Sequence, residues 1–241
     1  MPMRRFRLTG AGVAGLALLL AGVREARSQA PAPGAPPPTL AVLPFGNNTL
    51  GTDRQAMASL GVGVAAMLGD ALDRRGVHAI RRENVQRALR VQLRGGRILD
   101  TDARLRIGRS LGATAVVVGA VRTGGDELRI VASALGVEDE RRGEELSVQG
   151  RKSDTMALID DLAERLVRSL RLAVASTPVR EPAPPARAAL SFDAILLYSR
   201  ALAAVDDGKN DEAASLLQQV IDSAPDFEPA RAELRALQQR S

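Results

Sequence analysis

Residues 111–135 read LGATAVVVGAVRTGGDELRIVASAL, two apolar runs separated by a glycine-rich turn. The first run, Ala113–Val121, lacks the alternation of polar and apolar residues that marks a half-exposed strand. Such a run is typical of a strand covered on both faces, so we expect it at the centre of a sheet. Residues 123–126 suit a tight hairpin, and the alternating apolar residues after them predict an antiparallel return strand over Glu127–Leu135.

Upstream, the sequence predicts a strand, a helix and a second, short strand. The strand is Leu40–Phe45, and it is followed by the polar loop Gly46–Thr49. Apolar residues at helical spacing then predict one helix over Arg54–Arg75. Gly76 lies just past its end, where a left-handed cap is expected. The short strand covers Val77–Ile80.

The remaining elements complete a mixed sheet. They are a helix over Glu83–Leu93 with Val85, Leu89 and Leu93 on one face, a helix over Asp102–Leu111 opened by Asp100, Thr101 or Asp102, a strand over Glu144–Gly150, and a helix over Asp154–Ala173. This order combines a parallel beginning with an antiparallel end. It predicts an α/β domain over residues 39–175, an α+β mixed sheet with flanking helices.

LAVLPFGNNT at residues 40–49, together with the run at 111–135, resembles the envelope family that includes the amino-terminal domain of TolB and the curli-secretion protein CsgG. The resemblance covers residues 39–175 and consists of strands and turns, with no catalytic signature. It therefore implies a fold and a compartment, the cell envelope, more strongly than an activity.

The amino terminus has the features of an export signal. Arg4, Arg5 and Arg7 form a basic start, Leu8–Val23 is apolar, and small residues precede a cleavage site after Ser28. We expect residues 1–28 to be a cleaved signal peptide, with an uncleaved anchor as the alternative. The sequence leaves general secretory and twin-arginine export open. Residues 29–38 form a proline-rich tether.

Charge gives no support for nucleic-acid binding. The chain has 241 residues and a net charge of +5, and residues 1–28 contribute five arginines against one glutamate. No aromatic residue lies among the arginines between Arg74 and Arg109, although nucleic-acid binders combine a basic face with stacking aromatics. We interpret these arginines as solvated helix faces; the alternative is a docking surface for something anionic.

Residues that could carry catalysis or bind a metal are scarce. The chain has no cysteine, which excludes disulfides, thiolate metal sites and the lipid-attachment cysteine of CsgG-like secretion lipoproteins. The single histidine, His78, has no partner residues at metal-ligand spacing. No phosphate loop or nucleophile elbow is present in the sequence. We therefore predict no catalytic residues, no metal and no cofactor.

A second proline-rich linker, residues 176–188, precedes a helical region over residues 189–241. Here Ala201, Gly208, Ala213, Leu217 and Pro225 fall at the spacing of a tetratricopeptide (TPR) repeat, which the region resembles. The resemblance implies an all-α TPR-like helical hairpin plus one further helix. A single repeat cannot bury its own face, so it must dock on the α/β domain, a second copy or a partner.

Two candidate sites follow from these patterns. The first is a partner-binding face on the first TPR-like helix, formed by Ile195, Tyr198, Leu202 and Val205; the competing idea is that this face packs on the α/β domain. The second is the loop Asn47, Asn48 and Thr49, because α/β folds place ligands outside the carboxyl ends of strands. The alternative for that loop is a capping turn.

Together these features predict an exported, non-enzymatic envelope protein that acts as a protein-binding or assembly module. We expect it in the periplasm or associated with the outer membrane, without a lipid anchor, and with envelope proteins as partners. A homo-oligomer and a peripheral membrane association stay open. The alternatives are a CsgG-like outer-membrane secretion component, which would need longer pairs of alternating strands, and a regulator of a cell-wall synthase.

Overall fold

The computed structural model describes residues 38–51, 53–94, 98–170 and 190–239. The expected signal peptide, the tether up to residue 37 and the linker at 176–188 lie outside these ranges. Contacts among the described residues fall within one compact unit, Gly34–Ser241. No helix in the described ranges has the length and apolar character needed to cross a membrane.

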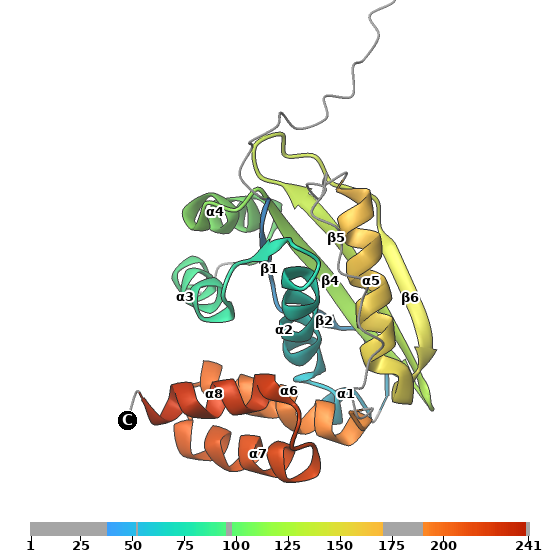
Figure 1. Cartoon of the computed structure of the whole chain (residues 1–241). Coiled ribbons are helices and arrows are strands. Elements are labelled where there is room, and N and C mark those ends of the chain that lie inside the picture. Colours follow the sequence, from blue (N-terminus) through green and yellow to red (C-terminus); the bar gives the residue numbers. More distant parts are fainter. Residues whose placement is uncertain (1–37, 52, 95–97, 171–189, 240–241) are drawn as a thin grey trace, which may run out of the picture. The chain divides into compact units, whose positions relative to one another are not determined.

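A six-stranded mixed sheet forms the centre of this unit (Figure 1). Its strands are β1 (Thr39–Val42), β2 (Gly46–Asn47), β3 (His78–Ala79), β4 (Ala115–Gly124), β5 (Glu127–Gly136) and β6 (Leu146–Arg151). The order is β3-β1-β4-β5-β6, with β2 paired to the far part of β4. The pairs of β1 with β3 and β4 are parallel, and those of β5 with β4 and β6 are antiparallel. The central position predicted for the apolar run is confirmed.

The turn between β4 and β5 is the predicted hairpin. Gly124 pairs with Glu127, which leaves Gly125 and Asp126 as the two turn residues. Gly125 has φ 57°, a left-handed conformation that two-residue hairpin turns favour and glycine adopts without strain.

The helices that flank the sheet are α1 (Asp53–Ala56), α2 (Leu60–Asp73), α3 (Arg82–Gln92), α4 (Thr101–Leu111) and α5 (Thr155–Ser169), the last preceded by the 3₁₀ turn η1 (Lys152–Asp154). Asp100 caps α4 by accepting a hydrogen bond of 2.7 Å from the Ala103 N–H. Gly76 follows α2 with φ 78°, as predicted. Leu93, expected on the apolar face of α3, is instead exposed at the end of that helix.

The single helix predicted over Arg54–Arg75 is wrong, because the structure divides it into α1 and α2. The Phe45 N–H donates a hydrogen bond of 3.1 Å to the Gly61 carbonyl. A Cβ atom at Gly61 would lie 2.0 Å from the Phe45 carbonyl oxygen. The first turn of α2 is thus held against the chain after β1, at a separation that only glycine allows.

Two hydrophobic cores lie on opposite faces of the sheet. Successive side chains of β4 point to opposite faces of the sheet. Val117 and Val121 pack in the core with α2 and α5 on one face, whereas Val116 packs in the core with α3 and α4 on the other. The contacts of α3 and α4 with the sheet are made to β1 and β4. The mixed sheet with flanking helices, followed by a helical part, confirms the predicted fold class.

The helical part comprises α6 (Phe192–Asp206), α7 (Asn210–Ser223) and α8 (Glu228–Gln238). Gly208, with φ 76°, forms the turn between α6 and α7, and Ala201, Ala213 and Leu217 are fully buried between the helices. Helix α6 packs closely on α2, since a Cβ atom at Gly63 would lie 1.9 Å from Ser199 Oγ. One core therefore extends from the sheet through α2 to α8.

Candidate functional site

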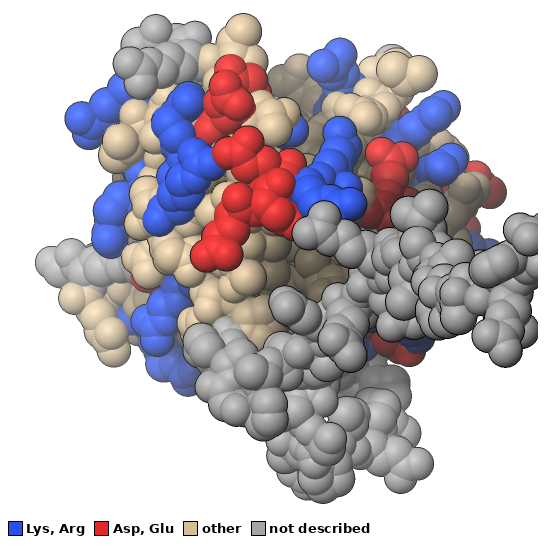
Figure 2. Space-filling view, turned by 90° about the horizontal axis from the view of Figure 1, so that it is seen from above, with Lys and Arg blue, Asp and Glu red and all other residues tan. Residues whose placement is uncertain are grey.

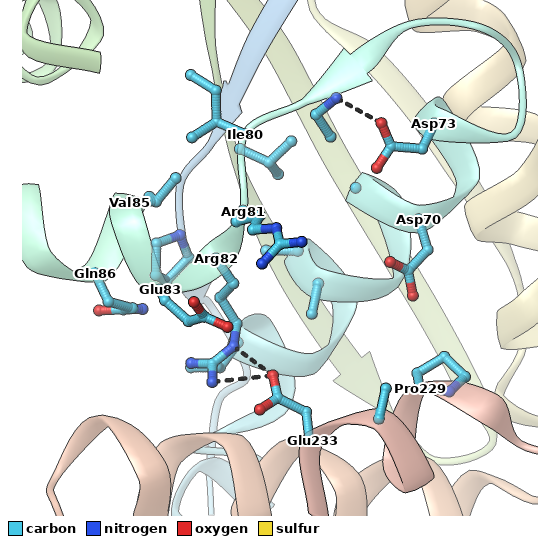
Figure 3. Close-up of a pocket in the computed structure, with 18 of the residues that line it drawn as sticks. Asp70, Asp73, Ile80, Arg81, Arg82, Glu83, Val85, Gln86, Pro229 and Glu233 are labelled. Carbon is cyan, nitrogen blue, oxygen red and sulfur yellow. Dashed lines mark hydrogen bonds and ion pairs between the residues drawn. The ribbon is translucent and has the colours of Figure 1, made fainter. Parts of the chain in front are cut away.

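A pocket of about 650 Å³ lies where β1 and β3 end. Its walls come from the residues after these strands, from α2 and from the start of α3, and α6 and α8 close the other side. Figure 3 shows Asp70 and Arg81 pointing toward the same space, with Pro229 and Glu233 of α8 beside it. The carboxyl ends of parallel strands are a common place for ligand pockets.

A partly buried charge cluster joins α3 to the helical part at this pocket. The Arg82 guanidinium forms ion pairs with Asp206 of α6 and, at 3.3 Å, with Glu233 Oε1 of α8. All three side chains are less than one-fifth exposed. Helices distant in sequence are thus linked through one arginine.

Burial and charge oppose each other in this cluster. Burial lowers the pKa of Arg82, but the attraction of Asp206 and Glu233 outweighs burial and leaves that pKa above its ordinary value. For Asp206 burial is the larger effect, and it raises the pKa of the carboxyl despite the opposing charge of Arg82. Arg82 therefore gains from the pairing, whereas Asp206 loses more through desolvation than it recovers.

Tyr198 forms part of the pocket wall and is 3% exposed. Its ring packs edge-to-face on Phe227, with centroids 5.0 Å apart. Burial raises the pKa of its hydroxyl above the ordinary value, and the negative charges of Asp70 and Glu233 raise it further, against a smaller opposing effect of Arg82. The phenol therefore stays protonated at physiological pH.

The structure does not leave the predicted partner-binding face exposed. Ile195, Tyr198 and Leu202 are buried in the core and Val205 is half-buried. The expectation of an open face is corrected in favour of the competing idea, packing on the α/β part through α2. The sequence feature that indicates this packing is Gly63 in α2, because the absence of a side chain there allows α6 to approach closely.

The predicted ligand loop is held by its own hydrogen bonds. Asn47 Oδ1 accepts from the Thr49 N–H at 3.0 Å, and Asn47 Nδ2 donates to the Arg54 carbonyl at 2.9 Å. Thr49 is buried, and its Oγ1 accepts from the Thr123 N–H at 3.1 Å. The side chain of Asn48 is exposed. These contacts are those of a capping turn, and a ligand role for the loop stays a prediction.

No metal site is evident within the described ranges. His78 is exposed, and its Nδ1 lies 3.9 Å from Asp73 Oδ1. No group of three or more potential ligands that could hold a metal ion occurs among the residues that the structure describes.

Three arginines line the face of β4, β5 and β6 that lies opposite α2 and α5. Arg122, Arg129 and Arg151 are exposed and alternate with core residues along their strands. Arg122 and Arg129 lie directly opposite each other in the antiparallel pair. Arg129 Nε donates to Ser147 Oγ at 3.0 Å, and neither Arg122 nor Arg129 has an ion-pair partner among the described residues. We call this surface the open sheet face.

Acidic residues gather elsewhere, at the end of the sheet. The connection between β5 and β6 includes Glu138, Asp139, Glu140, Glu144 and Glu145, all exposed. Arg109 of α4 pairs with Glu140. Seen from above, Figure 2 shows acidic side chains in a band with basic side chains on both sides. Charges at this end are mixed. The open sheet face also carries an exposed carboxylate, Glu127, which lies directly opposite Arg151 and accepts a hydrogen bond of 3.2 Å from Gln149 Nε2.

No family model matches the chain, and no curated protein matches it. Among solved structures, the LpoB C-terminal domain from Salmonella enterica is 9% identical, with 47% of this chain and 82% of that chain covered and a TM-score of 0.32. TolB from Acinetobacter baumannii is 12% identical, with a TM-score of 0.38; the match covers 56% of this chain and 28% of TolB. Lipoprotein GNA1162 from Neisseria meningitidis is 13% identical, with a TM-score of 0.39; the match covers 55% of this chain and 100% of GNA1162.

These similarities are too distant to support an inference about activity or partners. TolB belongs to the family that the sequence resembles. The CsgG-like and tetratricopeptide resemblances stay predictions.

Proposed function

We propose that this chain is an exported, non-enzymatic envelope protein that binds another envelope protein and contributes to an assembly. The expected signal peptide and the resemblance of residues 39–175 support the compartment. The open sheet face is the observation that supports a binding role. Its three arginines outnumber Glu127, the one carboxylate that the described strands place on this face, and neither Arg122 nor Arg129 forms an ion pair with a described residue.

The like-charge pair at the centre of this face has an energetic cost. Side chains directly opposite each other in an antiparallel pair have Cβ atoms about 5 Å apart, and like charges at that separation destabilise the pair. An acidic partner surface would relieve this repulsion and be attracted over several ångströms. We therefore expect the bound surface of the partner to carry Asp and Glu side chains.

The open sheet face can be tested with one substitution that separates folding from binding. Arg122→Glu converts the like-charge pair with Arg129 into an opposite-charge pair, so the free energy of unfolding should rise by up to about 1 kcal/mol. The same change should greatly reduce capture of the partner. A photo-reactive amino acid at the exposed position Gln149 would capture it in living cells, and mass spectrometry would identify it.

Arg168→Glu is the matched control, because Arg168 is exposed on α5, on the other side of the sheet. It makes the same charge change and should leave capture unaffected. Capture of the same protein by the Arg122→Glu variant at the wild-type yield would exclude the open sheet face as the binding site.

The identity of the captured protein separates the finer alternatives. A regulator of a cell-wall synthase would capture a synthase, and a secretion component would capture a transport partner. A captured second copy of this chain would indicate a homo-oligomer.

A further inference from the structure

The central sheet ends on one side in a strand with a free edge. Strand β6 is last in the order β3-β1-β4-β5-β6, and β5 is the one described strand that pairs with it. Figure 1 shows β6 at the rim of the molecule, with α5 packed over one of its faces. The opposite edge, β3, has two residues, whereas β6 has six. Of the two edges, β6 therefore has the length needed to pair with a further strand.

The backbone of β6 turns toward β5 at every second residue. The Lys152 N–H, just after the strand, donates to the Asp126 carbonyl at 2.8 Å. Hydrogen-bonded positions recur every two residues in an antiparallel pair, so the even-numbered residues of β6 face β5. The residues whose N–H and C=O groups point away from the sheet are Ser147, Gln149 and Arg151. Such a row of outward groups can pair with another strand.

Two exposed side chains of opposite charge lie at the ends of this edge. Glu145 immediately precedes β6, and Arg151 is its last residue. Neither side chain forms an ion pair with a described residue. A strand that begins with a negative charge and ends with a positive charge is complementary to an antiparallel copy of itself.

We propose that two copies of this chain pair antiparallel through their β6 edges, with Val148 of one copy opposite Val148 of the other. By two-fold symmetry, this register sets Glu145 of each copy opposite Arg151 of the other. It also sets Ser147 opposite Gln149, so that outward N–H and C=O groups exchange hydrogen bonds. Each opposite-charge pair across the two strands stabilises the contact.

The face of β6 beneath α5 favours the same register. Leu146 is half-buried, and Gly150 lies under Leu158, because a Cβ atom at Gly150 would be 3.1 Å from Leu158 Cδ2. The register places Leu146 of one copy opposite Gly150 of the other, so that a large side chain meets a small one. The second copy would thus cover the half-buried side chains of Leu146 and Leu158, which is favourable for apolar surface.

This pairing goes beyond the proposed function and does not rest on it. Side chains directly opposite each other in paired strands lie on the same face, so the open sheet faces of the two copies would form one continuous surface. Arg122→Glu, which tests binding of the protein partner, changes β4 and leaves the β6 edge unaltered. Partner binding and self-pairing can therefore fail separately.

Sedimentation equilibrium of the purified protein would test the pairing by charge reversal. The wild-type protein should form a dimer whose population rises with concentration. Glu145→Arg and Arg151→Glu each place like charges opposite each other at both ends of the contact, so each should raise the Kd of the dimer about tenfold or more. A mixture of the two variants restores both opposite-charge pairs in a heterodimer, so its Kd should return to near the wild-type value.

Three results would overturn the proposal. They are a protein that stays monomeric at submillimolar concentration, a dimer whose Kd neither substitution changes, and a mixture that associates no more tightly than the single variants. Because Arg151→Glu also places a carboxylate opposite Glu127 of its own chain, the melting temperature of each variant is measured alongside.

Gln149→Pro and Gln149→Ala form a matched pair that tests the backbone contact alone. Both substitutions remove the side-chain hydrogen bond to Glu127, but only proline also removes the outward N–H. Proline is tolerated at edge positions whose N–H faces solvent, so both variants should keep the circular dichroism spectrum of the wild type. Gln149→Pro should raise the Kd of the dimer about tenfold or more, and Gln149→Ala should change it little. Equal Kd values for the two variants would refute pairing through β6.

Discussion

Asp206 shows how a paired side chain can still reduce stability at neutral pH. Its folded pKa lies above the ordinary value of 3.8, because burial outweighs the attraction of Arg82. Below the ordinary pKa the carboxyl is protonated in both the folded and the unfolded chain. As the pH rises, the unfolded chain releases this proton first, so the contribution of Asp206 to stability falls through its folded pKa.

The Asp206→Asn variant lacks this titration. We expect its free energy of unfolding, relative to wild type, to increase as the pH rises from below 4 toward neutrality. Urea unfolding at several pH values would measure the difference, and Asp207→Asn, at the exposed neighbouring position, controls for loss of a carboxylate at this end of α6. A relative decrease over the same pH range would mean that the ion pair with Arg82 outweighs burial.

At some single residues, sequence patterns were sufficient to predict the local structure. Asp100 as the cap of α4, and Gly76 and Gly208 after α2 and α6, follow from local backbone chemistry. The cluster of Arg82, Asp206 and Glu233 could not be predicted in this way. Its members come from three helices far apart in sequence, and each alone has the appearance of a solvated charge.

At the scale of elements, the packing of α2 on α6 depends on small residues. Gly63→Ala would place a Cβ atom 1.9 Å from Ser199 Oγ and 2.8 Å from Ser199 Cβ, so the two helices must separate. Gly69→Ala, in the same helix, would meet only Ala79 Cβ, at 3.7 Å. Both substitutions gain about 1 kcal/mol from helix propensity, and only the first has a steric cost that exceeds this gain.

We therefore expect Gly63→Ala to lower the melting temperature and Gly69→Ala to raise it. Thermal unfolding followed by circular dichroism measures both. Stabilisation of the chain by Gly63→Ala would show that α6 does not pack on α2 as closely as the structure indicates.

The sequence distance between contacting residues determines which elements could be predicted. The central strand β4 and the hairpin to β5 depend on patterns within 25 residues, and both are confirmed. The break between α1 and α2 depends on Phe45 meeting Gly61, and the burial of α6 depends on α2, more than 100 residues earlier. Periodicity identifies an apolar face but cannot say which partner covers it.

At the scale of the whole molecule, the continuous core predicts cooperative unfolding of the sheet and the helical part. Tyr198→Ala combined with Leu202→Ser removes two buried side chains between α6 and the rest of the chain. Each large-to-small change in a core costs about 2–5 kcal/mol, so the double variant should lower the stability of the entire chain. One unfolding transition at a lower midpoint, seen by both circular dichroism and hydrogen exchange in β4, is expected.

Two transitions, with the sheet unchanged, would contradict that expectation. Such a result would mean that the helical part is energetically separate. Ser153→Ala, an exposed change on the turn before α5, serves as the control and should leave the midpoint near the wild-type value.

The core that contains both Leu40 and Leu237 has a kinetic consequence. During synthesis the amino-terminal elements emerge first, yet the side of α2 that faces α6 stays uncovered until the last helices have left the ribosome. Pairing of β1 with β4 also joins segments about 75 residues apart, and such distant contacts form slowly. We expect a chain that completes its core so late to remain unfolded while it is made. That state would suit the export that we propose, because threading through a narrow translocation channel requires an unfolded chain.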